Sequence, residues 1–224
     1  FNLQAQPFSN FEISRWQRQS AKVSIIRDNW GIPHIYGKTD ADAVFGLMYA
    51  QCEDDFKRVE MNYIERLGRL SEVKGEGSLY TDLMMRLLID STKAMEDFKK
   101  SPKWLKKLMN AYADGINYYL YKHPNTKPAL LTHFEPWYPM LWTDGSIGAI
   151  DVADVTVNEL KNFYSGMSPI TAAIQNKEYD PLPGGSTGFA IAPSKTASGN
   201  AILYINQHVT FYYIPEVPLT GGKG

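Results

Sequence analysis

The sequence PLPGGSTGFAIAPSKTASGNAILYINQHV, residues 181–209, contains a serine and a histidine at the two ends of a predicted β-hairpin. Ser186 follows a Pro-Gly-Gly run that suits neither a helix nor a buried strand. Two stretches with alternating apolar residues come next, Thr187 to Ala192 and Ala201 to Asn206. The Ser-Gly-Asn sequence between them has turn chemistry. The pattern therefore predicts an antiparallel hairpin directly after Ser186.

The predicted hairpin brings Ser186 close to His208. If the strands pair about a turn centred near Ala197, the two residues face each other at the open end, with their Cβ atoms roughly 4.5 to 5.5 Å apart. Such a pair is close enough for local contact and for shaping one pocket. The residues alone also leave open that Ser186 is a turn residue and that His208 is a strand-end histidine.

The GGSTG sequence around Ser186 also fits the G-x-S-x-G pattern of the nucleophile elbow in serine hydrolases. An elbow has a strand before the serine and a helix after it, so this alternative predicts a helix that begins at Thr187. The alternating sequence FAIA and the following Pro193 disfavour such a helix. The hairpin is the favoured interpretation.

The sequence before residue 181 predicts a small hairpin followed by helices. The predicted strands are Val23 to Arg27 and His34 to Tyr36, and a long amphipathic helix begins after Thr39, which is a suitable N-cap. Further helices are predicted over Tyr80 to Phe98, Pro102 to Tyr121 with Ser101 as its cap, Ser146 to Phe163, and Pro169 to Gln175.

The composition excludes several classes of protein. A chain of 224 residues with 44% hydrophobic content can bury a sizeable core. The net charge of -1 gives no basic surface for nucleic acid. No apolar run reaches the roughly 20 residues of a membrane span, and the first ten residues lack the order of a signal peptide. The one cysteine, Cys52, cannot form an internal disulfide and is typical of a buried thiol on a helix.

Two long stretches resemble the penicillin acylase family of N-terminal nucleophile (Ntn) hydrolases. VSIIRDNWGIPHIYGKTDADAVFGLMYAQCEDDFKRVEMNYIERLGRLSEVKG, residues 23–75, resembles the opening of that family's small chain. GGSTGFAIAPSKTASGNAILYINQHV, residues 184–209, resembles the start of its large chain. In the family a Gly-Ser bond at this point is cut autocatalytically, which would here be the Gly185–Ser186 bond of a zymogen.

The resemblance implies an α+β fold with the αββα architecture of Ntn hydrolases. Residues 1–185 would form the mainly helical small chain with its N-terminal hairpin, and residues 186–224 the truncated start of the β-rich large chain. The implied activity is hydrolysis of an amide, such as a β-lactam antibiotic or an acyl-homoserine lactone. Ser186 would be the nucleophile, and His208, 22 residues later, would orient it or bind near the oxyanion. No cofactor is implied, and the family resemblance implies a periplasmic or secreted protein.

Further assignments follow from the same resemblance. VNELKNFYSG resembles the family's pocket-lining helix, so Leu160, Phe163 and Tyr164 are expected to bind the acyl group, and Val209 is added to the substrate site. The sequence departs from the family at Thr187, where asparagine is usual, and at Gln207, where proline is frequent. The segment SGMSPITAA lacks the glutamate that binds calcium in relatives, so we expect no metal site in this chain.

The chain ends at Gly224, only 38 residues after Ser186, and is expected to need the remainder of the large chain as its partner in a heterodimer. In a single chain that covers residues 1–224, the Gly185–Ser186 bond would be intact and Ser186 would lack a free amine. We therefore expect the chain alone to be inactive. A noncatalytic N-terminal fragment of an acylase is the first alternative, and an elbow-type serine hydrolase the second.

Overall fold

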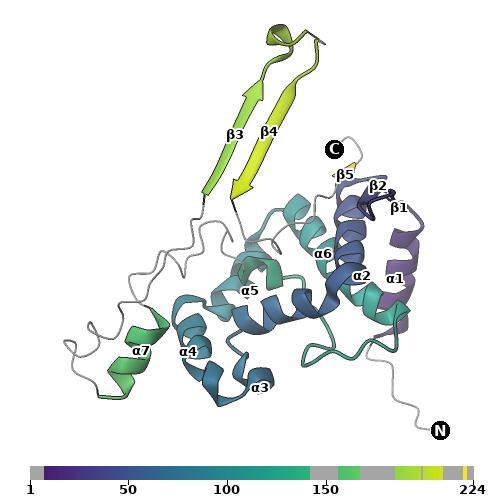
Figure 1. The fold of residues 1–224 in the computed structure, drawn as a ribbon. Helices are drawn as coiled ribbons and strands as arrows, with labels where there is room; N and C mark the ends of the chain where they lie inside the picture. Colours follow the sequence, from purple (N-terminus) through teal and green to yellow (C-terminus); the bar gives the residue numbers. More distant parts are fainter. Residues whose placement is uncertain (1–7, 142–155, 167–184, 198, 209–218, 221–224) are drawn as a thin grey trace.

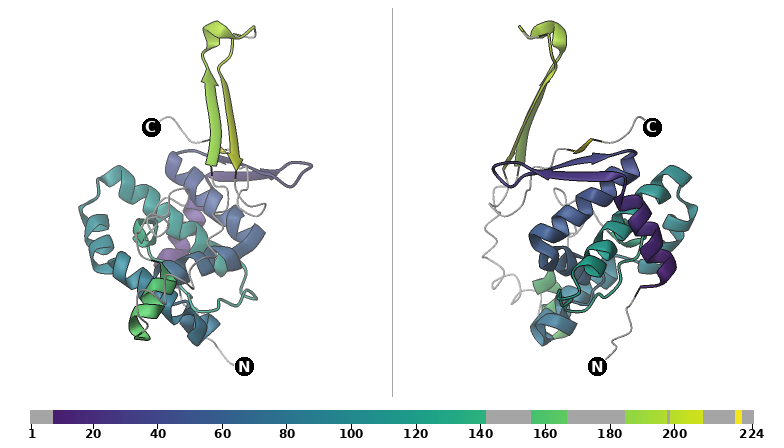
Figure 2. Two further views of the ribbon diagram at one scale, coloured as in Figure 1. Left: turned by 60° about the vertical axis from the view of Figure 1, so that its left-hand side comes forward. Right: turned by 90° about the vertical axis from the view of Figure 1, so that its right-hand side faces the viewer.

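The structure, a computed structural model, describes residues 8–141, 156–166, 185–197, 199–208 and 219–220. In these ranges it combines a helical body, a small sheet on that body, and a separate two-stranded hairpin that projects away from it (Figures 1 and 2). The expected mixture of helices and strands is confirmed.

The described helices are α1 (Asn10–Ser20), α2 (Asp40–Arg66), α3 (Ser71–Lys74), α4 (Leu79–Leu88), α5 (Ser91–Lys100), α6 (Lys103–Lys122) and α7 (Val157–Tyr164), with 3₁₀ helices η1 (Glu76–Ser78), η2 (Tyr138–Leu141) and η3 (Pro193–Lys195). The described strands are β1 (Val23–Arg27), β2 (Pro33–Gly37), β3 (Gly185–Ile191), β4 (Ile202–His208) and β5 (Leu219–Thr220).

The strands form two sheets. The first has the order β1-β2-β5. Its antiparallel β1–β2 pair, with Ile25 opposite Ile35, confirms the predicted N-terminal hairpin. The short strand β5 adds to β2 in parallel, with Leu219 opposite Ile35. Strands β3 and β4 form the second sheet.

Helix α2 is the central element of the body, and the sheet and α6 both pack on it (Figure 1). The Thr39 hydroxyl accepts a hydrogen bond from the Asp42 amide, 3.3 Å away, and so caps the helix as predicted. The backbone of Asp55 is not helical, and the Asp55 carboxylate accepts a hydrogen bond from the Arg58 amide at 3.1 Å. Asp55 therefore acts as an internal cap, which accounts for the kink in this long helix.

Two glycines let neighbouring elements approach the same turn of α2. A Cβ at Gly115 of α6 would overlap the backbone carbonyl oxygen of Phe45. A Cβ at Gly46 of α2 would lie 2.6 Å from Val23 Cγ1 and 2.7 Å from Ile35 Cγ2. Helix α6 and the sheet therefore reach α2 at positions where a larger residue has no room.

The buried carboxylate of Glu60 holds the connection that follows α6. Its side chain is 1% exposed, and it accepts hydrogen bonds from the backbone amides of Ala129 (2.9 Å), Leu130 (2.8 Å) and Leu131 (2.9 Å). Burial of a carboxylate is costly unless its oxygens are hydrogen-bonded. Glu60 therefore fixes an irregular segment of the chain onto α2.

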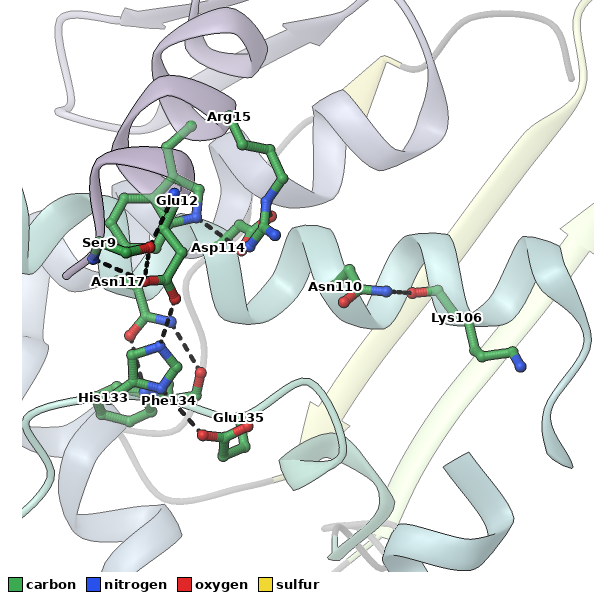
Figure 3. Close-up of polar contacts among 11 residues, drawn as sticks. Ser9, Glu12, Arg15, Lys106, Asn110, Asp114, Asn117, His133, Phe134 and Glu135 are labelled. Carbon is green, nitrogen blue, oxygen red and sulfur yellow. Dashed lines mark hydrogen bonds and ion pairs between the residues drawn. The ribbon is translucent and has the colours of Figure 1, made fainter. Parts of the chain in front are cut away.

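Helix α1 is fixed to α6 by Asp114 (Figure 3). Trp16 is fully buried, and its indole N–H donates to Asp114 Oδ1 at 2.7 Å. Arg15 Nε donates to Asp114 Oδ2 at 3.1 Å. The carboxylate thus has charged and neutral donors from one helix, which compensates its burial. Nothing in the sequence analysis anticipated α1.

Glu12 of α1 connects this helix to the segment after α6 (Figure 3). Its carboxylate accepts hydrogen bonds from the amide (2.9 Å) and hydroxyl (2.7 Å) of Ser9 in a capping box. Its other oxygen lies 3.0 Å from His133 Nε2. Partial burial acts to raise the pKa of Glu12, but the hydrogen bonds from Ser9 and His133 outweigh it and lower the pKa to about 2.

Four predicted helices need correction or lie partly or wholly outside the described residues. The single helix expected over residues 80–98 is wrong, because α4 ends at Leu88 and a second helix, α5, begins at Ser91. The Asp90 carboxylate caps α5 by accepting from the amides of Thr92 and Lys93. Helix α6 is confirmed, but Pro102 and not Ser101 is its N-cap. Of the helix expected over 146–163, α7 begins only at Val157, and residues 146–155 lie outside the described ranges, as do residues 169–175.

We predict that Gly115→Ala lowers the free energy of unfolding by about 2 kcal/mol, because the new methyl group forces α2 and α6 apart. Gly77→Ala is the matched control. A Cβ at Gly77 meets no atom within 4 Å, so this change should be neutral or stabilising by up to about 1 kcal/mol. Urea unfolding of both variants measures the difference, and equal effects would contradict the close approach of α6 to α2.

The low pKa of Glu12 predicts a pH dependence of stability. The pKa falls from 4.5 to about 2 on folding, so the ionised carboxylate stabilises the folded protein above about pH 4.5. This contribution is lost as the pH falls towards 2. Urea unfolding between pH 2 and 6 should show wild type more stable than Glu12→Gln at pH 6, with the difference vanishing near pH 2. A difference that is independent of pH would contradict this contribution.

Candidate functional site

The hairpin of β3 and β4 carries the predicted nucleophile. The strands are antiparallel, as predicted, and their ladder runs from Gly185 opposite His208 to Ile191 opposite Ile202. At the far end, the Thr196 hydroxyl donates to the carbonyl oxygen of Asn200 at 2.7 Å. The Gly185–Ser186 peptide bond lies inside strand β3, at the open end of the hairpin.

The register differs by one residue from the one that places Ser186 opposite His208. Ser186 is opposite Gln207, and His208 is opposite Gly185. The two residues are thus within one residue of facing each other, as expected. Successive positions along a strand belong to opposite faces of the ribbon. Ser186 shares a face with Gln207, and the position of His208 therefore belongs to the other face. The hairpin register therefore does not support a directly opposed Ser186–His208 pair.

The structure contradicts the nucleophile-elbow interpretation. That interpretation requires a helix from Thr187, whereas residues 185–191 form a strand. The next helical residues are those of the short 3₁₀ helix η3, which contributes to the turn between β3 and β4. Gly199 in the same turn has a φ of 71°, a conformation that favours glycine.

The expected substrate-binding residues lie on α7. Thr156 and Glu159 form a capping box at its start, with the Thr156 amide donating to Glu159 Oε2 at 2.7 Å. Leu160 is buried, while Phe163 and Tyr164 are 76% and 61% exposed. The two rings contact each other edge to face, with their centroids 5.2 Å apart.

The structure does not bring the two groups of predicted site residues together. Helix α7 packs against α4, and it lies at the opposite end of the molecule from the β3–β4 hairpin in both figures (Figures 1 and 2). Val209, the remaining predicted substrate-binding residue, lies outside the described residues. The assignment of these residues to one site stays a prediction.

The sequence RDNWGIPH forms the turn between β1 and β2 and the strand ends beside it. Asp28 caps the β1–β2 turn by accepting from the amides of Trp30 (2.8 Å) and Ile32 (3.0 Å), and its second oxygen lies 3.2 Å from His34 Nε2. Desolvation acts to raise the pKa of Asp28, but these hydrogen bonds outweigh it and lower the pKa. The motif therefore stabilises a hairpin turn, a role that the sequence analysis did not assign to it.

Arg27 joins the same hairpin to α2. Its guanidinium lies 3.2 Å from a carboxylate oxygen of Glu53 and 2.8 Å from one of Asp54, and it donates to the carbonyl oxygen of Gly31 at 2.9 Å. Desolvation acts to lower the pKa of Arg27, but the two carboxylates outweigh this effect and raise it. The Arg-Asp element of the sequence thus positions the sheet on α2.

Within the described part of the chain, no group of three or more His, Cys, Asp or Glu side chains is placed to hold a metal ion. Among the helices described, none is long and apolar enough to cross a membrane.

The sequence model of the penicillin amidase family matches residues 22–217. This match covers both the β1–β2 hairpin and the hairpin that carries Ser186, and it extends over most of the chain. The chain therefore belongs to the penicillin amidase family, as the sequence resemblance indicated.

Individual relatives are similar over different lengths. The penicillin acylase 2 proenzyme of Pseudomonas sp. (strain SE83) is 25% identical over 244 residues, which covers 89% of this chain and 31% of the relative. An acyl-homoserine lactone acylase QuiP of Pseudomonas syringae pv. tomato is 34% identical over 107 residues, or 48% of this chain and 13% of the relative. Penicillin G acylase of Escherichia coli is 27% identical over 155 residues, or 66% of this chain and 17% of the relative.

Among solved structures, a thermostable penicillin G acylase from Alcaligenes faecalis is a neighbour with a TM-score of 0.49 and 19% sequence identity, covering 68% of this chain and 79% of that chain. The chain spans less than a third of the length of the curated relatives named above. The relatives named are acylases, which supports an amide hydrolase as the activity of the protein family to which this chain belongs.

Proposed function

We propose that this chain is the N-terminal part of an acylase that hydrolyses a linear amide with Ser186 as its N-terminal nucleophile. The observation that carries the proposal is the position of Ser186: it is the second residue of strand β3, directly after Gly185, inside the region that matches the penicillin amidase family. A strand that begins at the scissile bond would hold the nucleophile at the end of an ordered element after cleavage.

Processing would start with Ser186 itself. Its hydroxyl oxygen adds to the carbonyl carbon of Gly185, the C–N bond of the Gly185–Ser186 peptide breaks, and the released amine takes up the hydroxyl proton. Water then hydrolyses the resulting ester, which leaves a carboxylate on Gly185 and restores the Ser186 hydroxyl. The products are two chains, with Ser186 as the first residue of the second.

A free amine at Ser186 gives the nucleophile its own base. An α-amino group has an ordinary pKa of about 7.7 to 8.0, so a useful fraction is unprotonated near neutral pH. The amine accepts the hydroxyl proton as the oxygen attacks the carbonyl carbon of the substrate amide. The leaving amine takes up a proton, and water hydrolyses the acyl-enzyme ester to release the acid. In this scheme the uncut chain is the inactive precursor, because the Ser186 nitrogen is still in the peptide bond to Gly185.

We assign His208 a role beside the scissile bond. Its ladder position opposite Gly185 places its backbone next to the residue whose carbonyl carbon is attacked. A backbone N–H at this position could stabilise the negative oxygen that develops during attack. This role replaces the direct side-chain pairing with Ser186 that the predicted register implied.

We propose that Leu160, Phe163 and Tyr164 of α7 belong to the acyl-binding site, in which the exposed rings of Phe163 and Tyr164 contact the acyl group and the buried Leu160 holds α7 in place. Aromatic rings that serve core packing are buried. Both rings are largely exposed here, so they are available to contact a ligand. The relatives support two substrate classes, a β-lactam side chain and an acyl-homoserine lactone. The remainder of the large chain would be the partner that completes the pocket, in a periplasmic or secreted enzyme.

The second candidate function is a noncatalytic N-terminal fragment. In this candidate the Gly185–Ser186 bond stays intact, so the serine nitrogen is an amide and not a base. The two candidates differ in one experiment: addition of the missing large-chain residues restores amide hydrolysis only if the chain is part of an enzyme.

In the full-length protein, Ser186→Ala should remain an uncut precursor and lose amide hydrolysis, because one hydroxyl serves both reactions. Ser186→Cys should still be cut, since a thiol can attack the Gly185 carbonyl, but its turnover should be impaired by the different size and nucleophilicity of sulfur. Mass spectrometry measures the cut, and a panel of β-lactam, homoserine-lactone and lipopeptide amides measures the activity.

The matched control is Ser194→Ala, which removes an exposed serine hydroxyl from the turn of the same hairpin. It should be cut and should hydrolyse amides as the wild type does. A Ser186→Ala protein that is still cut after Gly185 and still active would overturn the proposal, and Ser186 would then be only the first polar residue of a strand.

A further inference from the structure

Strand β1 is an edge strand whose outer edge has hydrogen-bonding groups to offer. Lys38 donates its amide proton to the carbonyl oxygen of Lys22, and Asp28 donates to Ile32, in the same register as the β1–β2 ladder. Hydrogen-bonded pairs alternate with non-hydrogen-bonded pairs in an antiparallel ladder. The even-numbered residues of β1 therefore bond to β2, whereas the backbone groups of the odd-numbered residues, 23, 25 and 27, point away from it.

A groove of about 510 Å³ lies beside this edge. Its lining comes from the end of α1, from β1, from α2 and from α6, and consists of Ser20, Val23, Ile25, Arg27, Phe45, Gly46, Tyr49, Glu53 and Tyr118. The side chains of the odd-numbered residues of β1 therefore line the groove. The backbone N–H and C=O groups of the same residues lie at the outer edge of β1 and do not bond to β2.

The burial of the sheet shows that this groove is incompletely filled. On the side of the sheet that faces α2, Pro33 and Ile35 of β2 are buried, and Ile35 is 1% exposed. Val23 and Ile25 of β1, on the same side, are only half-buried. Apolar surface on one face of a sheet is normally covered by another element, and among the described residues this cover is less complete over β1 than over β2.

The polar groups of the groove favour a neutral occupant. Arg27 and Glu53, which both line the groove, form an ion pair at 3.2 Å, so their opposite charges compensate each other. Desolvation and the nearby Glu53 carboxylate raise the pKa of Tyr49 to about 12, so its hydroxyl stays protonated at neutral pH. The groove thus offers apolar surface, hydroxyl groups and backbone edge groups, which together match an extended peptide better than an ion.

We propose that an extended strand of the large chain of the acylase pairs with the outer edge of β1 and inserts alternate apolar side chains into this groove. The identity of the partner rests on the proposed function. The other edge of the same sheet already accepts a strand from the part of the chain after Ser186, since β5 pairs with β2. The match covers only 31% of the penicillin acylase 2 proenzyme of strain SE83. That relative therefore has a long additional segment of chain that could include such a strand.

Amide hydrogen exchange of β1 tests the proposal. In the 224-residue chain, the amides of Val23, Ile25 and Arg27 should exchange fast, while those of Ser24 and Ile26, which bond to β2, are protected. In the full-length protein all five should be protected, with exchange at the three odd-numbered positions slowed at least about tenfold. Fast exchange at these three positions in the full-length protein would overturn the proposal.

A pair of variants separates backbone pairing from side-chain packing. Ile25→Pro removes an amide proton that β2 does not use, whereas Ile25→Ala keeps it, and both remove the isoleucine side chain from the groove. In the full-length protein, Ile25→Pro should lose the protection of Val23 and Arg27, and Ile25→Ala should keep it. Retained protection of Ser24 and Ile26 in both variants verifies that the hairpin is folded.

Two other outcomes would also overturn the proposal. Protection of the odd-numbered amides in the 224-residue chain, together with a dimer in size-exclusion chromatography, would identify a second copy as the occupant. Unchanged protection in full-length Ile25→Pro would show that no strand pairs there. Neither result depends on the cut after Gly185, so failure of this proposal and failure of the proposed catalytic role remain distinguishable.

Discussion

The close approach of two elements to one turn of α2 is the constraint on which the body of the protein depends. Gly115 allows α6 to reach the carbonyl group of Phe45, and Gly46 allows the β1–β2 sheet to reach the next residue of the same helix. With both contacts made, α2 becomes the common support for a helical layer and a sheet. The buried carboxylates of Glu60 and Asp114 then attach the connecting segment and α1 to this core.

The body and the β3–β4 hairpin differ in how they are stabilised. The body has an extensive core of buried apolar side chains. In the hairpin, by contrast, Phe189 and Ile202 are 51% and 45% exposed. An isolated two-stranded hairpin is at best marginally stable in water. The element that bears Ser186 and strand β1 thus both have apolar side chains that are exposed or only half-buried.

Local sequence signals predicted the elements that depend on local chemistry. The cap at Thr39, the β1–β2 hairpin and the β3–β4 pairing follow from capping residues and from alternation, and all three are confirmed. The expected pairing of Ser186 with His208 is wrong by one residue because the turn is centred between residues 196 and 197 and not on Ala197. The groove beside β1 is formed by elements that are far apart in the sequence. Local sequence patterns do not predict how such elements pack together.

In the proposed mechanism, cleavage after Gly185 turns Ser186 into an N-terminal nucleophile. The most direct test of this mechanism is mass spectrometry of the active full-length protein after reaction with an ester that acylates it quickly and is hydrolysed slowly. The account predicts that the acyl group is found on a peptide whose first residue is Ser186. An acyl group on another residue, or an active protein in which the Gly185–Ser186 bond is intact, would contradict it.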